Sequence, residues 1–150
     1  LVSKQFRADM SRQGIFGHSM GGHGAMTIAL KNPDRFKSCS AFAPIVQPST
    51  ADWSAPALEK YLGSDKAAWR RYDACALVED GAYFPEFLID QGKADSFLEN
   101  GLRPWLFEEA IKGTDIGLML RMHERYDHSY YFISSFMDDH LTWHAERLEK

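Results

Sequence analysis

The sequence contains few cysteines, no surplus of basic residues and no long apolar run. Two cysteines, Cys39 and Cys75, occur in 150 residues and form no C-x-x-C pair, which excludes a disulfide framework and favours free thiols in a reducing compartment. Lys and Arg number 17 against 21 Asp and Glu, so a net charge of -4 offers no basic surface to a nucleic acid. Since a membrane-spanning helix needs about 20 apolar residues in a row, no such span is expected. A small molecule is therefore the expected partner.

Residues 17–21, with the sequence Gly-His-Ser-Met-Gly, are the most informative feature that is present. An apolar Gly-Ile-Phe precedes them, and apolar residues at helical spacing follow as far as Asn32-Pro33. A strand, a tight turn and a helix in this order form a nucleophile elbow, which exposes the serine, here Ser19, at the carboxyl end of the strand. We expect glycine to be required on both sides of Ser19, because the backbone is strained there and neighbouring elements pack closely.

Predicted strands and helices alternate along the chain, which indicates an α/β fold with a parallel sheet, helices on both faces and ligand sites at the carboxyl ends of the strands. Residues 44–82 contain three prolines and four aromatic residues with little periodicity before residues 66–71, and they are interpreted as an excursion over the sheet. No repeat or linker divides the chain, so one domain or part of one is expected. The predicted strands are 14–17, 38–43, 87–89 and 117–122, and the predicted helices are 2–6, 22–31, 102–110 and residue 130 to the C-terminus.

Apolar spacing also predicts the buried faces of the last two helices. The first face consists of Leu102, Trp105, Leu106 and Ala110, and the second of Ile133, Phe136, Met137, Leu141, Ala145 and Leu148.

A serine nucleophile requires a histidine base and an acid that orients this base. In α/β-hydrolases the chain order is Ser, then Asp or Glu, then His. Of the six histidines, His128 is the best candidate, because it lies in a loop just beyond the end of a predicted strand. The other histidines lie in the elbow region before any acid (His18 and His23), in a predicted strand (His123) or in the last helix (His140 and His144).

Three aspartates are candidates for the acid. Asp95 ranks first because it lies in the loop beyond the third predicted strand, whereas Asp90 ends that strand and is expected to brace its turn. Asp127 ranks third, because adjacent residues in an extended segment point in opposite directions and His128 follows it directly. The backbone N–H of Met20 is expected to donate one oxyanion hydrogen bond, and the second donor normally comes from a loop earlier in the fold.

A zinc site is an alternative use for two of the histidines. The spacing His140-x-x-x-His144 places both imidazoles on one face of a helix. However, Leu141 stands where a zinc protease has glutamate, and no third ligand is apparent. A packed or solvated helix face is therefore the preferred interpretation, and no metal is expected.

Five segments together resemble the S-formylglutathione hydrolases, also called esterase D, a family of α/β-hydrolases. The resemblance covers nearly the whole chain and is far more specific than the elbow alone. The segments are Gly-His-Ser-Met-Gly-Gly-His-Gly-Ala at 17–25, Ser-Ala-Phe-Ala-Pro-Ile at 40–45, Tyr-Leu-Gly at 61–63, Leu-Ile-Asp-Gln-Gly at 88–92 and Tyr-Asp-His-Ser-Tyr-Tyr-Phe at 126–132.

The resemblance implies a catalytic triad of Ser19, Asp95 and His128. It implies hydrolysis of the thioester S-formylglutathione to glutathione and formate, through a formyl-enzyme and without a metal or organic cofactor. This reaction is the second step of glutathione-dependent formaldehyde detoxification, and the family commonly also cleaves small carboxylic esters. A cytoplasmic homodimer is the corresponding expectation for location and assembly.

The chain departs from the family pattern in three places. Arg125 stands where the family usually has glycine, and Asp52-Trp53-Ser54 stands where it has Pro-Trp-Gly. Trp53 is a candidate for lining the acyl pocket, with ordinary packing of a large apolar side chain as the alternative. The chain also begins just before the nucleophile strand, so residues 1–150 are expected to be the C-terminal part of a single α/β-hydrolase domain, weak or inactive on its own.

Two other functions are consistent with the sequence. A general short-chain carboxylesterase would use the same triad on esters. Alternatively, the chain is a non-catalytic half-domain that binds a partner supplying the missing strands.

Overall fold

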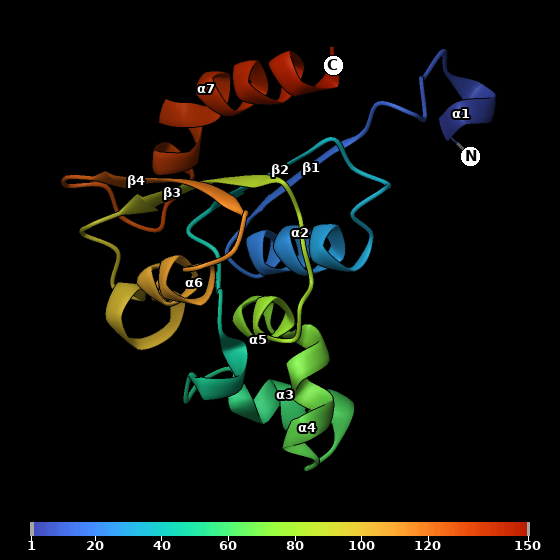
Figure 1. The fold of residues 1–150 in the computed structure, drawn as a ribbon. Coiled ribbons are helices and arrows are strands. Elements are labelled where there is room, and N and C mark those ends of the chain that lie inside the picture. The colour runs from blue at the N-terminus through green and yellow to red at the C-terminus, as the bar shows by residue number, and fades with distance from the viewer. Residues whose placement is uncertain (1, 150) are drawn as a thin grey trace.

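Four parallel strands form the centre of the molecule, which a computed structural model describes for residues 2–149. Helix α7 covers one face of the sheet, and α2, α5 and α6 lie on the other (Figure 1). The elements are α1 Val2–Gln5, β1 Gly14–His18, α2 Met20–Lys31, β2 Ser38–Phe42, the 3-10 helix η1 Pro48–Thr50, α3 Ala55–Leu62, α4 Lys66–Trp69, the 3-10 helix η2 Arg70–Tyr72, α5 Ala74–Glu79, β3 Glu86–Gly92, the π-helical turn η3 Leu98–Leu102, α6 Trp105–Ala110, β4 Gly117–His123 and α7 Tyr130–Leu148.

The strand order β1-β2-β3-β4 follows the chain, and each neighbouring pair is parallel. Parallel neighbours need a crossover, and this brings the carboxyl ends of all four strands to one edge of the sheet. β2 is buried along its whole length and β3 nearly so, because helices cover both faces. The predicted α/β fold with helices on both faces is confirmed.

The larger core lies between the sheet and helices α2, α5 and α6. Met26, Ala29 and Phe107 pack there against Phe87 of β3, all but excluded from solvent. Full burial of a Met or Phe side chain stabilises a fold by about 1.5–3 kcal/mol. Both cysteines are free and buried, and burial raises the pKa of the Cys39 thiol above its usual range. They are packing residues rather than reactive thiols.

The excursion over residues 44–82 contains more regular structure than its sequence pattern predicts. α3, α4, α5 and two 3-10 turns occupy most of it, whereas only residues 66–71 show a helical pattern. The longest of these helices has eight residues, which gives too few turns for periodicity to be recognised.

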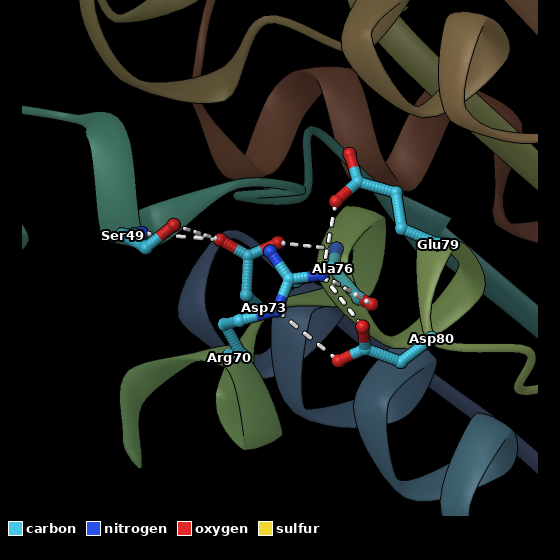
Figure 2. A network of polar contacts seen from close by, with 6 residues as sticks. All are labelled: Ser49, Arg70, Asp73, Ala76, Glu79 and Asp80. Carbon is cyan, nitrogen blue, oxygen red and sulfur yellow. Dashed lines mark hydrogen bonds and ion pairs between the residues drawn. The ribbon is translucent and has the colours of Figure 1, made fainter. Parts of the chain in front are cut away.

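A buried carboxylate connects two distant parts of this excursion (Figure 2). Asp73 accepts hydrogen bonds from the hydroxyl and the N–H of Ser49 and, as the N-cap of α5, from the N–H of Ala76 at 2.9 Å. Arg70 lies nearby and binds Asp80 with Nη2 at 2.8 Å, but both of these side chains are exposed. Exposed ion pairs contribute about 0–1 kcal/mol, so Asp73 holds the segment more firmly than the ion pair does.

The predicted face of residues 102–110 is confirmed for Leu102, which is buried, and for Leu106 and Ala110, which pack against the core, but it is wrong for Trp105. Leu102 belongs to the π-helical turn, because the helix α6 begins only after Pro104. Trp105 is 37% exposed, and Phe107 is the fully buried residue instead. Because the chain changes from the π-helical turn η3 to helix α6 around Pro104, the spacing of one continuous helix does not apply, and Phe107 is buried in place of Trp105.

Helix α7 begins at Tyr130 as predicted, and the predicted face is confirmed in its first half, where Ile133 is buried and Phe136 and Met137 pack against the core. The second half of the helix presents a different face to the sheet. Leu141 is 51% exposed, whereas His140, Trp143 and His144 are buried together with Phe132 and Ile133. The histidines can be buried because serines of β2 supply hydrogen bonds, as described below. No helix within residues 2–149 combines the length and the apolar character needed to cross a membrane.

Candidate active site

Ser19 lies at the junction of β1 and α2 in a strained backbone conformation. Its φ of 55° and ψ of -116° are unusual for a residue with a side chain. The Ser19 N–H donates to the Phe42 carbonyl at 2.9 Å, and the Ser19 carbonyl accepts from the His23 N–H at 2.9 Å. Hydrogen bonds to β2 and within α2 thus hold the strain in place, as is common at functional sites.

Gly17 is the glycine that this turn requires. A β-carbon at Gly17 would collide with the backbone of Gly21, where α2 begins. A β-carbon at Gly21 would meet nothing within 4 Å. The expectation that both glycines are sterically required is therefore wrong for Gly21, since the crowding lies on the strand side of the turn.

Met20 is the first residue of α2, and its side chain is 70% exposed. The first N–H groups of a helix have no acceptor within the helix, and the helix dipole favours negative charge at this end. The Met20 N–H directly follows Ser19 at the start of α2, and its role as an oxyanion donor stays a prediction.

The loops that follow β3 and β4 lie against each other. The Lys93 N–H donates to the His123 carbonyl at 2.8 Å, and the Ala94 N–H donates to the Tyr126 carbonyl at 2.9 Å. Glycine is required at position 92, because a β-carbon on Gly92 would collide with the Tyr126 carbonyl. This contact brings the loop of Asp95 beside the loop of the candidate base.

Asp95 and His128 are joined directly. The Nδ1 of His128 lies 2.6 Å from Asp95 Oδ2, and Asp95 is 5% exposed. The other carboxylate oxygen accepts from the Phe97 N–H at 2.9 Å, and Gln91 Nε2 donates to Oδ2 at 3.1 Å. Burial alone would raise the pKa of Asp95, but the hydrogen bonds from His128 and Phe97 and the charge of His128 outweigh it and lower the pKa. The acid is therefore held ionised against the imidazole.

Two rings enclose the His128 imidazole. The His18 ring lies 4.4 Å from it, and the Phe97 ring meets it edge-on at 5.1 Å. Burial, and next the charge of His128, lower the pKa of His18, so His18 stays neutral beside the candidate base. Sequence reasoning did not identify His18 as a neighbour of His128, although its place beside Ser19 was a usable signal.

The contact between the elbow and His128 is made by the ring of His18, the residue before Ser19. Within residues 2–149 the Ser19 hydroxyl makes no hydrogen bond, so the structure does not join it to the imidazole. Hydrogen bonds of catalytic groups are often long in unliganded enzymes and tighten when substrate binds.

The two other candidate acids are engaged elsewhere. Asp90 is fully buried and receives two hydrogen bonds from Arg121, each of 2.6 Å. Asp127 accepts from the Ser129 N–H at 3.0 Å in a local turn. Asp95 is thus the aspartate that the fold brings to His128.

The two histidines of the zinc alternative have hydrogen-bonding roles in the core. Ser40 Oγ lies 2.8 Å from both His140 Nδ1 and His144 Nε2, and Ser38 Oγ lies 2.6 Å from His144 Nδ1. In the part of the chain that the structure describes, no group of three or more His, Cys, Asp or Glu side chains could hold a metal ion. Because His140 and His144 are both buried, this helix face is packed and not solvated.

An apolar cavity of about 380 Å³ lies beside Met20, the residue that follows Ser19. Met20, Ile45, Trp53 and Tyr61 contribute to its walls. The Trp53 ring, 44% exposed, also packs 6.3 Å from that of Phe97, which itself touches His128. Trp53 therefore lies between the cavity and the candidate base.

Arg125 occupies a backbone position that favours glycine. Its φ is 65°, in the left-handed region where a side chain is disfavoured. This explains in physical terms why glycine is usual here in the family that the sequence resembles. The residue lies three positions before His128, so the strain is stored in the loop of the candidate base.

Comparison with known proteins agrees with this geometry. Residues 1–143 match the model of the Esterase family, described as "Putative esterase". The chain is 51% identical over 148 residues to an S-formylglutathione hydrolase from Paracoccus denitrificans and 49% identical over 151 residues to one from Arabidopsis thaliana, covering 99% of this chain in each case. It superimposes with a TM-score of 0.96 and 88% identity on a solved S-formylglutathione hydrolase from Agrobacterium tumefaciens, covering 97% of this chain and 53% of that one.

The chain spans about half the length of the curated relatives it matches, 53% in each case. The match nevertheless includes the elbow, both loops that carry the candidate acid and base, and most of α7. On this evidence the chain belongs to the Esterase family of α/β-hydrolases.

Proposed function

We propose that the protein hydrolyses S-formylglutathione to glutathione and formate, using Ser19 as nucleophile, His128 as base and Asp95 as the orienting acid. The 2.6 Å contact between Asp95 and His128 is the observation that supports this most strongly, because a buried carboxylate on Nδ1 leaves Nε2 free to act as a base. The names of relatives at about half identity supply the substrate.

In the first half of the reaction, His128 Nε2 accepts the proton of the Ser19 hydroxyl while Oγ attacks the thioester carbonyl carbon. The carbonyl oxygen becomes negatively charged and accepts a hydrogen bond from the Met20 N–H. The carbon–sulfur bond then breaks, and the sulfur takes the proton from His128, which gives glutathione and a formyl-enzyme.

In the second half, His128 accepts a proton from water, and the resulting hydroxide attacks the formyl carbon. The bond to Ser19 Oγ breaks, and the proton on His128 returns to the serine. Formic acid leaves and releases its proton to solvent to give formate. Asp95 stabilises the imidazolium in both halves, so these residues need no metal or organic cofactor for the chemistry.

The test is hydrolysis of S-formylglutathione by the purified protein at its full natural length. Turnover that is lost in Ser19→Ala supports the proposal, and wild-type protein without turnover contradicts it. The 150-residue chain assayed in parallel tests the expectation that it is weak alone, since one missing oxyanion donor costs about 10²- to 10³-fold in turnover.

A general carboxylesterase is the second candidate, and the apolar cavity beside Met20 favours it. A formyl group occupies far less than 380 Å³, whereas a longer acyl chain or an aryl group would use that space. Comparing kcat/KM for the formyl thioester with that for aryl esters of increasing acyl length discriminates the two. A higher value for butyrate than for formyl would favour the carboxylesterase.

A role in formaldehyde detoxification, in the cytoplasm and as a homodimer, belongs to the same proposal. Growth of a deletion strain on formaldehyde tests the role, and light scattering of the purified protein tests the assembly. Formaldehyde tolerance that is unchanged by the deletion would contradict the role in detoxification.

A further inference from the structure

Gln91 is a fully buried amide at the carboxyl end of β3, next to the candidate acid. Its Nε2 donates to Asp95 Oδ2 at 3.1 Å and to the Gly92 carbonyl at 3.1 Å. Asp90, the preceding residue, binds Arg121 instead, because successive side chains of a strand point to opposite faces. The Gln91 side chain therefore belongs to the environment of Asp95.

The orientation of this amide is determined by its surroundings. Both oxygens that face it, Asp95 Oδ2 and the Gly92 carbonyl, can only accept, so the nitrogen must point toward them. The Gln91 Oε1 is buried and has no partner within residues 2–149. A residue selected only to fill this space would leave no buried carbonyl unpaired, and methionine has a similar volume without one.

The donor from Gln91 acts on the same oxygen that receives the imidazole. Asp95 Oδ2 accepts from His128 Nδ1 and from Gln91 Nε2, while Oδ1 accepts from the Phe97 N–H. Three donors on two oxygens define the plane of the carboxylate. Without Gln91, Oδ2 would be held by the imidazole of His128 alone.

We propose that Gln91 is a positioning residue, which holds Asp95 Oδ2 in line with His128 Nδ1 and shares the negative charge of that oxygen. The inference rests on the proposed roles of Ser19, His128 and Asp95. Gln91 touches neither substrate nor the reacting atoms and acts through Asp95.

The first test is Gln91→Met in the protein at its full natural length. We expect kcat to fall about tenfold with KM within twofold, because a misplaced carboxylate orients the base poorly. We also expect the acid limb of the kcat/KM profile to move to higher pH by about half a unit, because a carboxylate with one donor fewer stabilises the imidazolium more strongly. An acid limb that stays in place or moves to lower pH overturns the proposal, even if kcat falls.

A double-mutant cycle tests whether Gln91 acts through Asp95. Gln91→Met should cost about tenfold in the wild-type background and less than twofold when Asp95→Asn is already present. An equal cost in both backgrounds would overturn the proposal and indicate a structural effect. If Gln91→Met does not fold, Gln91→Leu, which also lacks the donor, replaces it in the same cycle.

The rate of Ser19 labelling by a fluorophosphonate separates this inference from the choice of substrate. Labelling reports activation of the serine whether or not S-formylglutathione is hydrolysed. A wild-type protein that labels rapidly but leaves the thioester intact would contradict the proposed substrate, and a tenfold slower labelling of Gln91→Met would still support the positioning role. Equal labelling of the two proteins would overturn it.

Discussion

The molecule contains two sets of serine, histidine and aspartate, one at the edge of the sheet and one in its interior. In the buried set, Ser40 Oγ lies 2.8 Å from His140 Nδ1, and His140 Nε2 lies 3.4 Å from Asp90 Oδ2. All three residues are fully buried. By residue type this set resembles a catalytic triad, but the serine lies at Nδ1 and the aspartate at Nε2, the reverse of the catalytic arrangement.

The surroundings of the two sets differ in three respects. Ser40 lies inside β2 with its hydroxyl bound to two imidazoles, whereas the Ser19 hydroxyl at the end of β1 makes no hydrogen bond within residues 2–149. The His128 side chain is 21% exposed and lies near a cavity, but that of His140 is sealed. The charge of Asp90 is neutralised by the guanidinium of Arg121.

The position of each serine, histidine and aspartate in the sheet determines whether the set is accessible to a substrate. Side chains in the loops beyond the carboxyl ends of parallel strands are open to ligands. Residues of the same types within the sheet, covered by a helix, act as packing and hydrogen-bonding groups. Burial raises the pKa of Asp90, but hydrogen bonds and charges from His140 and Arg121 more than offset it and lower the pKa. The buried set therefore stabilises the sheet against α7 and has no access to substrate.

Replacing each serine by alanine should give the largest contrast. Ser19→Ala should lower kcat by about 10⁴-fold or more with little change in stability, because the nucleophile is lost. Ser40→Ala should leave kcat per folded molecule within about twofold and lower the free energy of unfolding by about 1–3 kcal/mol, because two buried imidazoles lose a partner. Kinetics and urea unfolding of both variants check this, and a large kinetic effect of Ser40→Ala would refute the comparison.

Replacing each aspartate by asparagine should separate orientation from stability. Asp95→Asn should lower kcat by up to about 10⁴-fold, since the amide favours the wrong tautomer of His128. Asp90→Asn should lower the free energy of unfolding by about 3 kcal/mol, because Arg121 loses its buried partner. Activity measured per folded molecule is the readout, and Asp127→Asn, in the neighbouring turn, is the control that should change neither quantity much.

Acidification should weaken the buried region before the carboxylates protonate. Burial, followed by the charges of His140 and Arg147, lowers the pKa of His144 from 6.5 to about 4. The unfolded chain thus binds a proton that the folded chain does not, and about 3 kcal/mol of stability is lost as the pH falls from about 6.5 to about 4.

Unfolding free energies at pH 7, 5.5 and 4.5 measure this effect. His144→Gln should flatten the dependence over that window, whereas Thr142→Gln on the exposed face of α7 should retain the wild-type slope. An unchanged slope in His144→Gln would show that another group titrates there.

The smallest expected effect concerns the cavity beside the edge set. Trp53→Ala should raise KM for a butyrate aryl ester about tenfold, which is about 1.4 kcal/mol, by removing an apolar wall. The KM for the formyl thioester should change less than threefold, because the formyl group does not extend into the cavity. Trp53→Phe is the matched control, and an equal effect on both substrates would indicate that Trp53 only packs.

Local patterns were sufficient to predict the elements that carry the site. The glycine and apolar residues around Ser19 predict the elbow, and β1, α2 and α7 lie within a few residues of their predicted positions. The chain order of hydrolases admits both Asp90 and Asp95, and the loop position ranks Asp95 first; its catalytic role stays a prediction.

Contacts between distant segments account for what could not be predicted. The burial of His140 and His144 depends on serines about 100 residues earlier in the chain, and no helical pattern contains that information. Asp90 pairs with Arg121 because the register of β3 and β4 places them side by side, and this register follows from the assembled sheet. The amide of Gln91 becomes significant only when the loop after β3 folds back over it.

The most direct measurement is labelling of the protein at its full natural length with a fluorophosphonate, followed by mass spectrometry to locate the adduct. The account predicts a single adduct on Ser19, which is lost in Ser19→Ala and retained in Ser40→Ala. An adduct on another residue, or none on a protein that is folded, would contradict the assignment of the active site to the edge of the sheet.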